Sequence, residues 1–458
     1  MLNTNIKKLY VWSIVLEPMT YFVLSDQSLT GVGTNVSRII QIVVLFLFVR
    51  SAIVGGLSFR ISTFTRSRYS LFVLYFCLAV MSGVIGLLTG AYSLNTVPDT
   101  HGVGAFSSFL NSSYVRPLVE YVILIYYIVY YAVFPTIFLK RKEDLKYFFR
   151  VFFFMFNLSL VVGVIGLFLA SQFDVYIGRN LYELYSEGAR NIGPRFHGFF
   201  GEPRDAFVVL GLGAAFYCLK SIILDYTERK YYYILILICA ILTQSTSGLL
   251  GIVIFISLYV AFHAFQFNHL PKMIAVAFFF GIVVYIGVSY SDRVSTALAI
   301  LWEARASFAM GGNLHPQLET QAVNIYPIFW IIDNLLKLNV LPFLFGGGLG
   351  SAAIINQVYF SCALHTFGGI PGLNNPHSNM VRLLSETGII GFIIYISACY
   401  YPIRRAAAGL SLRDRNKIVL FSLLVLSLSL AHRSVSNLIF LGVFFAAMNV
   451  FQANLNKK

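Results

Sequence analysis

Charged residues are scarce in this chain. Asp, Glu, Lys and Arg make up only 11% of its 458 residues, whereas 58% are hydrophobic, and the mean hydropathy is +0.76. Ordinary soluble domains carry about 25% charged residues. The composition therefore excludes a soluble protein with a large core and indicates a membrane protein that crosses the bilayer many times.

Acidic residues are scarcer than basic ones, with 19 Asp and Glu against 33 Lys and Arg, for a formal net charge of +14. In a soluble protein that balance would suggest a nucleic-acid partner. In a membrane chain it is first a topology signal, so we expect no nucleic acid.

Several chemical signatures are missing as well. The five cysteines are spread singly, four of them within apolar runs, so no intrachain disulfide framework is expected. The glycine-rich run 345–351 lacks the Lys-Ser/Thr ending of a P-loop, which argues against ATP binding. No Asp-x-Asp pair, common in nucleotide-sugar enzymes, stands on the side of the membrane that we assign to the cytoplasm.

Long apolar runs are abundant, and a helix of roughly 20 apolar residues spans the hydrocarbon core. Twelve runs predict an all-α protein with about twelve transmembrane helices and both termini on one side. They are 9–24, 39–57, 70–92, 117–139, 151–170, 206–224, 231–244, 247–264, 273–290, 388–403, 418–432 and 437–453.

Lys and Arg orient this map. Most of the 33 fall on the side of the termini, which predicts cytoplasmic termini. Nearly all of the basic residues on the opposite side are arginines. That bias suits an external anion site, because guanidinium grips phosphate or carboxylate with two hydrogen bonds. Exclusion of lysine by the topology rule explains the bias equally well.

The spans divide the chain into five segments. Residues 1–170 hold the first five helices, 171–205 a first long extracytoplasmic segment, and 206–290 helices six to nine. Residues 291–387 form a large extracytoplasmic loop, and 388–458 hold the last three helices. Long loops on a rigid membrane scaffold commonly carry function.

The stretch Gly193 to Phe207, "GPRFHGFFGEPRDAF", opens a predicted helix. Pro203 suits the first helical turn, and Arg204 at a positive helix end is unfavourable without a nearby anion. Glu202 and Asp205 could supply that anion as a salt-bridged cap. Alternatively, Arg195 and Arg204 together hold an external anion.

Two further stretches have modest interpretations. In "TQSTSGLLG", residues 243–251, hydroxyls and Gln244 could cap the following helix. In "FGGGLGS", residues 345–351, the glycines indicate a flexible bend or a close backbone approach.

The stretch "NNPHSNMVRLLSETGIIGF", residues 374–392, places a histidine, an arginine and a glutamate at the mouth of a helix. Ser378 is a good N-cap, and a helix from there puts Arg382 and Glu386 on one side. His377 precedes the cap, so we expect His377 to face the reacting groups and Glu386 to pair with Arg382 or another arginine.

Taken in order, four stretches resemble the Wzy-type polysaccharide polymerases and the related O-antigen ligases. They are "R-x-x-G-x-x-x-E-P" from Arg195, the serine-rich turn, the glycine run, and "H-S" with "E-x-G-x-x-G" from His377 and Glu386. The resemblance covers roughly residues 190–395 and the twelve-helix layout. It implies a membrane-embedded, inverting glycosyltransferase of the GT-C kind in a bacterial cytoplasmic membrane.

The resemblance also implies a chemistry. The donor would be an undecaprenyl-diphosphate-linked oligosaccharide, used outside the cytoplasmic membrane with neither metal nor cofactor. In many members the serine-rich turn holds an arginine, for which Arg293 or Arg305 could substitute here. The candidate proton acceptors are His377, Glu202 and Glu386, in that order, and the candidate diphosphate ligands are Arg195, Arg204, Arg293, Arg305 and Arg382.

Three functions stay open at this point. A polymerase joins lipid-linked repeats, whereas a ligase transfers the glycan to a lipid A core. A flippase or secondary transporter fits the crossings too, although transporters more often carry charges near the bilayer midplane. The expected partners are the lipid-linked oligosaccharide and membrane lipid, with a chain-length regulator as a further candidate.

Overall fold

The computed structural model of the chain describes residues 4–22, 35–55, 69–88, 115–178, 194–263, 327–352, 354–355 and 376–455. Within these ranges the chain is helical and forms no β-strand. The predicted all-α class is therefore confirmed.

Seven helices in the described ranges are long and apolar enough to cross a membrane, so the chain is a multi-pass membrane protein. They are Val36–Val54, Ser70–Leu88, Pro117–Phe138, Lys142–Phe173, Pro203–Leu224, Asn379–Gly409 and Ser436–Ala453. Shorter apolar helices cover Lys230–Leu242, Thr246–Phe262 and Pro327–Leu336. The predicted span at 273–290 lies outside the described residues, and the number of twelve stays a prediction.

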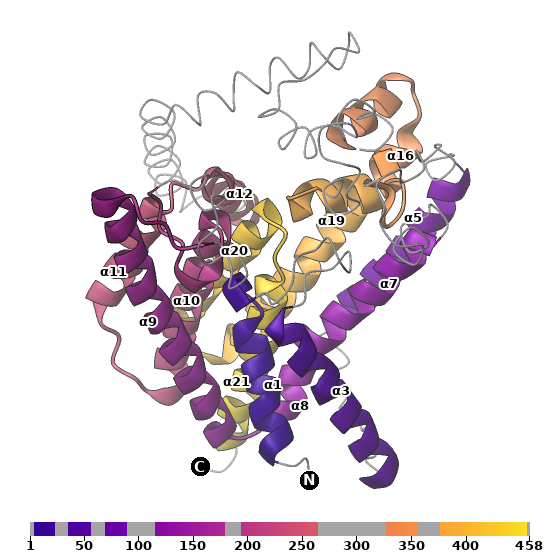
Figure 1. The fold of residues 1–458 in the computed structure, drawn as a ribbon. Coiled ribbons are helices and arrows are strands. Elements are labelled where there is room, and N and C mark those ends of the chain that lie inside the picture. The colour runs from indigo at the N-terminus through magenta and orange to yellow at the C-terminus, as the bar shows by residue number, and fades with distance from the viewer. Residues whose placement is uncertain are drawn as a thin grey trace.

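The elements follow one another as a bundle of antiparallel helices (Figure 1). They are α1 (Thr4–Leu16), η1 (Thr20–Phe22), α3 (Val36–Gly55), α5 (Ser70–Leu88), α7 (Val115–Tyr127), the π-helix η2 (Ile128–Val133), α8 (Phe134–Phe138), α9 (Lys142–Phe173), η4 (Gly198–Phe200), α10 (Pro203–Leu224), α11 (Lys230–Leu242), α12 (Thr246–His263), α16 (Val340–Phe345), α19 (Asn379–Ala406), η6 (Ala407–Gly409), α20 (Leu412–Ala431) and α21 (Ser436–Leu455).

The centre of the bundle is formed by α10, α20 and α21. Within the apolar windows of α10 and α21, 72% and 78% of the residues are buried, against 17% for α3, which lies at the periphery. Phe148 and Phe152 of α9 meet Phe216 of α10 edge-on, and Phe216 in turn contacts Phe440 of α21. Aromatic packing therefore joins the central helices to α9.

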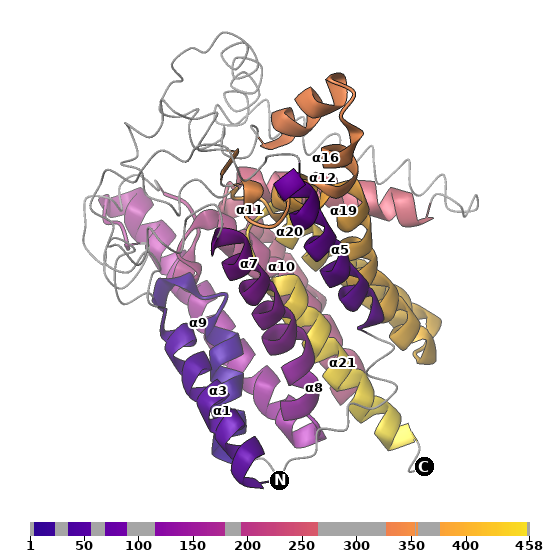
Figure 2. The ribbon, with the colours of Figure 1, turned by 90° about the vertical axis from the view of Figure 1, so that its right-hand side faces the viewer.

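One predicted span is interrupted, and another is formed by three helical segments in succession. The run 9–24 does not form one helix, because α1 ends at Leu16 and Pro18 follows, a residue that cannot continue a helix. The run 117–139 is confirmed as one apolar span, Pro117–Phe138. It consists of α7, η2 and α8, which Figure 2 shows as one column beside α21.

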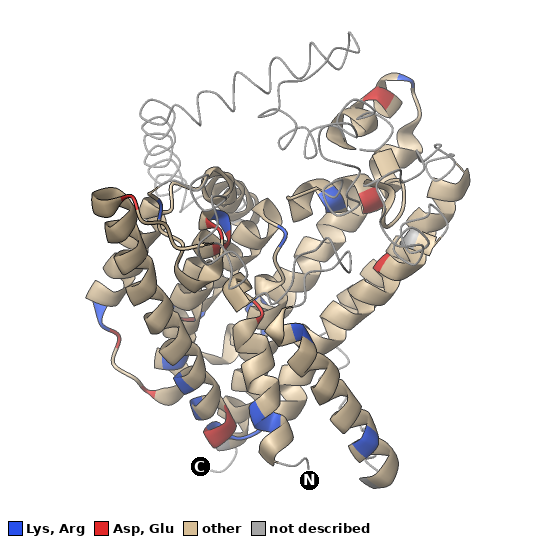
Figure 3. Cartoon of the chain, in the orientation of Figure 1, with Lys and Arg blue, Asp and Glu red and all other residues tan. Residues whose placement is uncertain are grey.

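The two ends of the bundle differ in charge. Both termini lie at the lower end in Figure 1, and Figure 3 shows Lys and Arg at the lower ends of α1, α3 and α9. The N-terminal ends of α10 and α21 lie at the opposite end. The helix that begins at Asn379 includes residues 379–387, which the sequence had assigned to the large loop.

Candidate functional site

The start of α10 brings an arginine and a carboxylate to the helix end. Pro203 occupies the first helical position, as the sequence predicted. Glu202 is the N-cap residue, and its side chain makes no capping hydrogen bond. Arg204 Nε lies 2.5 Å from Glu202 Oε2, and the two side chains are 35% and 30% exposed. The pair neutralises the misplaced charge at the helix end, yet about a third of the Arg204 side chain stays exposed.

The start of α19 is fixed onto the turn between α20 and α21. Ser378 Oγ accepts a hydrogen bond from the Val381 amide, which confirms the predicted N-cap, and donates one of 2.9 Å to the Leu430 carbonyl. The Asn379 side-chain amide donates to the carbonyls of Ser429 and Ser434, at 2.9 and 3.0 Å. His377, one residue before this anchor, therefore has a fixed place beside the turn.

His432, the C-cap residue of α20, joins that turn to α10. Its Nε2 lies 2.5 Å from Asp205 Oδ1, and the His432 side chain is only 8% exposed. Its other ring nitrogen, Nδ1, is buried and makes no hydrogen bond within the described part of the chain. Buried polar atoms are nearly always hydrogen-bonded, so this nitrogen is unusual.

The charged side chains near this turn affect the pKa of His377. Burial lowers the pKa of His377, and the nearby Arg204, His432 and Arg433 lower it further, to about 4, against the opposing effect of Asp205. The imidazole is therefore neutral at neutral pH. We call Arg204, Asp205, His377, His432 and Arg433 the histidine cluster.

The lowered pKa of His377 predicts a pH dependence of stability. The unfolded chain protonates this imidazole near pH 6.5, whereas the folded chain does so only near pH 4. Stability contributed by the neutral ring is therefore lost as pH falls from about 6.5 to about 4, by up to about 3 kcal/mol.

The measurement is thermal unfolding at pH 7 and near pH 4. His377→Gln should lose less stability than the wild type across this window, because it has no imidazole to protonate. Arg405→Gln, in the last turn of α19, is the control and should follow the wild type. Parallel curves for all three proteins would contradict the assignment.

A second polar group lies further along α19 and forms a buried arginine triad: Arg382, Glu120 and Glu386. Arg382 Nε lies 3.2 Å from both carboxylate oxygens of Glu386, as the i,i+4 spacing predicted. Its Nη2 donates to Glu120 of α7. The side chains of Glu120 and Glu386 are only 2% and 3% exposed, so this one guanidinium holds two buried carboxylates.

The glycine run packs against the same part of α19. Gly347 and Gly348 donate their amides to the carbonyls of Ser385 and Glu386, at 2.8 and 2.9 Å. Gly388, with φ of 66° and ψ of −174°, interrupts the helix there. The sequence had offered a bend or a close backbone approach, and the structure shows the close approach.

Gly388→Ala should destabilise the protein by about 1–3 kcal/mol or more. Its conformation is essentially restricted to glycine, and an added Cβ would lie 2.3 Å from the Leu344 backbone. Thermal unfolding measures the loss. Gly409→Ala is the control, because its Cβ would meet nothing within 4 Å. Equal melting temperatures for the two variants would overturn this reading of the kink.

The remaining predicted residues are placed as follows. Arg195 precedes α10 in the segment of His197, whose pKa is lowered by burial and by Arg195. Ser245 Oγ accepts from the Gly248 amide at 3.1 Å, which confirms the predicted cap of α12. Arg293 and Arg305 lie outside the described residues.

The structure therefore brings together some candidates and not others. Arg204, Glu202 and His377 gather at the N-terminal ends of α10 and α19. Glu386 follows His377 by nine residues, roughly 13 Å along a helix, and is engaged with Arg382. His432 and Asp205 are the members of the cluster whose pairing the sequence did not indicate.

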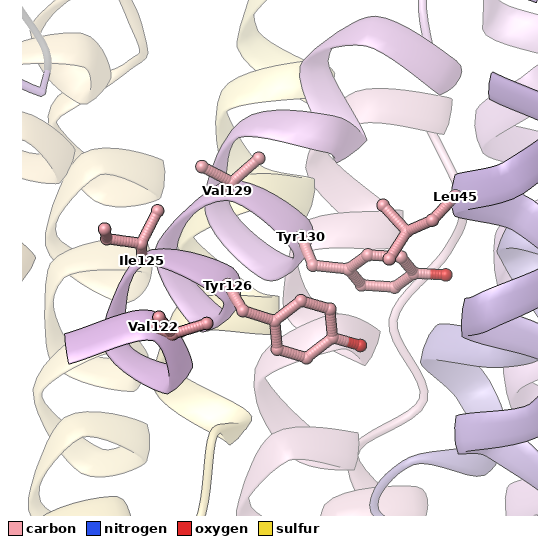
Figure 4. Close-up of a pocket in the computed structure, with 6 residues that line it drawn as sticks. All are labelled: Leu45, Val122, Ile125, Tyr126, Val129 and Tyr130. Carbon is pink, nitrogen blue, oxygen red and sulfur yellow. The ribbon is translucent and has the colours of Figure 1, made fainter. Parts of the chain in front are cut away.

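No three His, Cys, Asp or Glu side chains in the described ranges lie close enough together to hold a metal ion. A shallow groove of about 260 Å³ lies elsewhere, between α3 and the α7–η2 column (Figure 4). It is lined by Leu45, Val122, Ile125, Tyr126, Val129 and Tyr130. Four of these side chains are aliphatic and two are tyrosines, and none of them carries a charge that could bind a diphosphate.

Comparison with models of known protein families finds no match to this chain, and comparison with curated proteins finds none either. The fold and the site therefore define a class only, a helical multi-pass membrane protein with a polar cluster where several helices begin or end.

Proposed function

We propose that this protein is a polysaccharide polymerase that joins undecaprenyl-diphosphate-linked oligosaccharide repeats at the outer face of a bacterial cytoplasmic membrane. The observation that carries the proposal is the histidine cluster. It combines a partly exposed arginine at a helix N-terminus with two imidazoles from separate parts of the chain. The motif resemblance supports the same proposal, because the stretches that carry it include Arg204 and His377.

The distribution of charge supports the proposed orientation. Lys and Arg gather at the end of the bundle that holds both termini (Figure 3), and positively charged ends face the cytoplasm. The histidine cluster lies where α10 and α21 begin, at the opposite end. A substrate delivered to the outer leaflet would meet the cluster there.

The proposed reaction forms one glycosidic bond. The acceptor hydroxyl oxygen attacks the anomeric carbon of the donor, the bond from that carbon to the lipid diphosphate breaks, and the hydroxyl proton passes to a base. Inversion follows from this single displacement. Negative charge grows on the leaving diphosphate, so Arg204 and the N-terminal dipole of α10 would stabilise the transition state more than the ground state.

Arg195 and Arg433 are further candidates for the diphosphate, and Arg293 and Arg305 stay candidates from the sequence alone. Arg382 is less suited, because two carboxylates already occupy its guanidinium. In the proposed mechanism Arg382 stabilises the structure of α19, and the arginines of the histidine cluster bind the diphosphate.

The test is product analysis with the purified protein and a synthetic undecaprenyl-diphosphate repeat unit as the only substrate. A ladder of longer lipid-linked glycans supports the polymerase. Product that appears only after addition of a lipid A core acceptor would make the protein a ligase. Passage of intact lipid-linked repeat across a vesicle membrane, without either product, would make it a flippase. A change of ladder length on adding a candidate chain-length regulator would identify that partner.

A further inference from the structure

We propose that His432 and Asp205 form a proton-accepting dyad, in which Nδ1 of His432 takes the proton of the acceptor hydroxyl and Asp205 positions the ring. The role in transfer rests on the proposed function, whereas the geometry of the dyad does not. It assigns to the turn after α20 a chemistry that the motifs around His377 do not include.

The hydrogen bond between the two side chains fixes the tautomer. An ionised carboxylate only accepts hydrogen bonds, so at the 2.5 Å contact the Nε2–H of His432 donates to Asp205 Oδ1. The neutral ring must then carry its free lone pair on Nδ1. A carboxylate that orients an imidazole in this way also stabilises the imidazolium formed when the ring takes a proton.

The unpartnered nitrogen points to a ligand. The His432 residue as a whole is 6% exposed. Its Nδ1 atom is buried and makes no hydrogen bond in the ranges described. If His432 served only for packing, burying that atom unpaired would destabilise the protein. A substrate hydroxyl, donating to Nδ1, would supply the missing partner and would be held at the atom that receives its proton.

His377 is less suited to the same task. Its pKa of about 4 makes it a weak base near neutral pH, whereas efficient general bases have a pKa near the working pH. Its neutral ring lies close to Arg204 and is suited to form a hydrogen bond with the lipid-linked donor substrate. In this proposal His377 binds the donor substrate and His432 accepts the proton.

The histidine cluster draws its groups from three parts of the chain. Arg204 and Asp205 come from α10, His377 precedes α19, and Arg433 follows in the turn. When the acceptor oxygen bonds to the anomeric carbon, its proton moves to Nδ1 and the diphosphate leaves with the bonding pair. The imidazolium then loses the proton to solvent, so the step needs no further reactant.

The first experiment reads the dyad without any activity. Solid-state NMR of ¹⁵N-histidine-labelled protein in lipid bilayers reports the tautomer of each ring, and His432→Gln identifies the signals of His432. We expect a protonated Nε2 and a bare Nδ1 in the wild type. Asp205→Asn, which keeps the shape of the side chain, should remove that preference. A wild-type His432 that carries its proton on Nδ1 would overturn the proposal.

The second experiment is kinetic and uses the synthetic lipid-linked repeat. His432→Gln and Asp205→Asn should each lower kcat by about 100-fold or more, with little change in the KM for the donor. His377→Gln should instead mainly raise that KM. Arg405→Gln, in the last turn of α19, should behave as the wild type.

The outcomes separate the two proposals. If His432→Gln keeps kcat within about threefold of the wild type and stays folded, His432 is not the base, although the polymerase stands. If the wild type makes no product from any acceptor, the proposed function falls and the base role falls with it. The NMR signals still decide whether the Asp205–His432 hydrogen bond exists.

Discussion

Arg382→Leu should lower the free energy of unfolding by about 3–5 kcal/mol, the usual cost of removing one partner from a buried ion pair. Two carboxylates depend on this guanidinium: Glu386 at 3.2 Å and Glu120, whose side chain is 2% exposed. Without Arg382 both carboxylates would lose this guanidinium while they remain buried. Thermal unfolding of the purified protein, followed by far-ultraviolet circular dichroism, measures the loss.

The design includes its own controls. Arg405→Leu, in the last turn of α19, removes the same side chain at the other end of the helix and should change stability little. The double variant Glu120→Gln, Arg382→Leu should recover part of the loss, because one of the two buried carboxylate charges is gone. If Arg382→Leu has the same melting temperature as Arg405→Leu, the triad does not stabilise the bundle.

Arg204→Gln should lower kcat for glycan transfer by about 100- to 1,000-fold, the effect typical of removing one preorganised donor from a developing anion. The effect should appear in kcat more than in the KM, because the charge on the diphosphate grows as the bond breaks. The measurement is steady-state transfer from the synthetic lipid-linked repeat. It rests on the proposed function and on the 35% exposure of the Arg204 side chain.

Arg405→Gln is the matched control for charge, and Glu202→Gln separates the salt-bridged cap from the anion site. If Arg204 only caps α10 through Glu202, Arg204→Gln and Glu202→Gln should each destabilise the protein by a similar amount. Both should then keep the kcat of the wild type. If Arg204 holds the diphosphate, Glu202→Gln should leave most of the activity while Arg204→Gln does not. Undiminished kcat in Arg204→Gln would remove this residue from the site.

Short-range features of the site were predictable from the sequence. Ser378 caps α19, Pro203 opens α10 and Arg382 reaches Glu386, because helix caps and i,i+4 pairs involve residues within four positions of each other. The helical class followed from the apolar runs. These predictions needed only local spacing.

Long-range pairs were not predictable in the same way. Glu120 lies 262 residues before Arg382, and Asp205 lies 227 residues before His432. Nothing in "AHRS" at residues 431–434 distinguishes this histidine from a polar residue in any helix connection. Its partner follows only from the packing of α10 against α20. A stretch of polar residues between two late apolar runs was the one available signal.

The kink at Gly388 ties two segments of the chain into one folding unit. In an uninterrupted helix the carbonyls of Ser385 and Glu386 would accept the amides of residues 389 and 390. Here they accept those of Gly347 and Gly348 instead. Without the glycine run the Ser385 carbonyl would lose this partner, and the Glu386 carbonyl would keep its hydrogen bond from Ser82 Oγ. We therefore expect the two segments to open together. The amides of Gly347 and Gly348 should then exchange with deuterium at the rate of the adjoining turns of α19, well below that of an exposed loop.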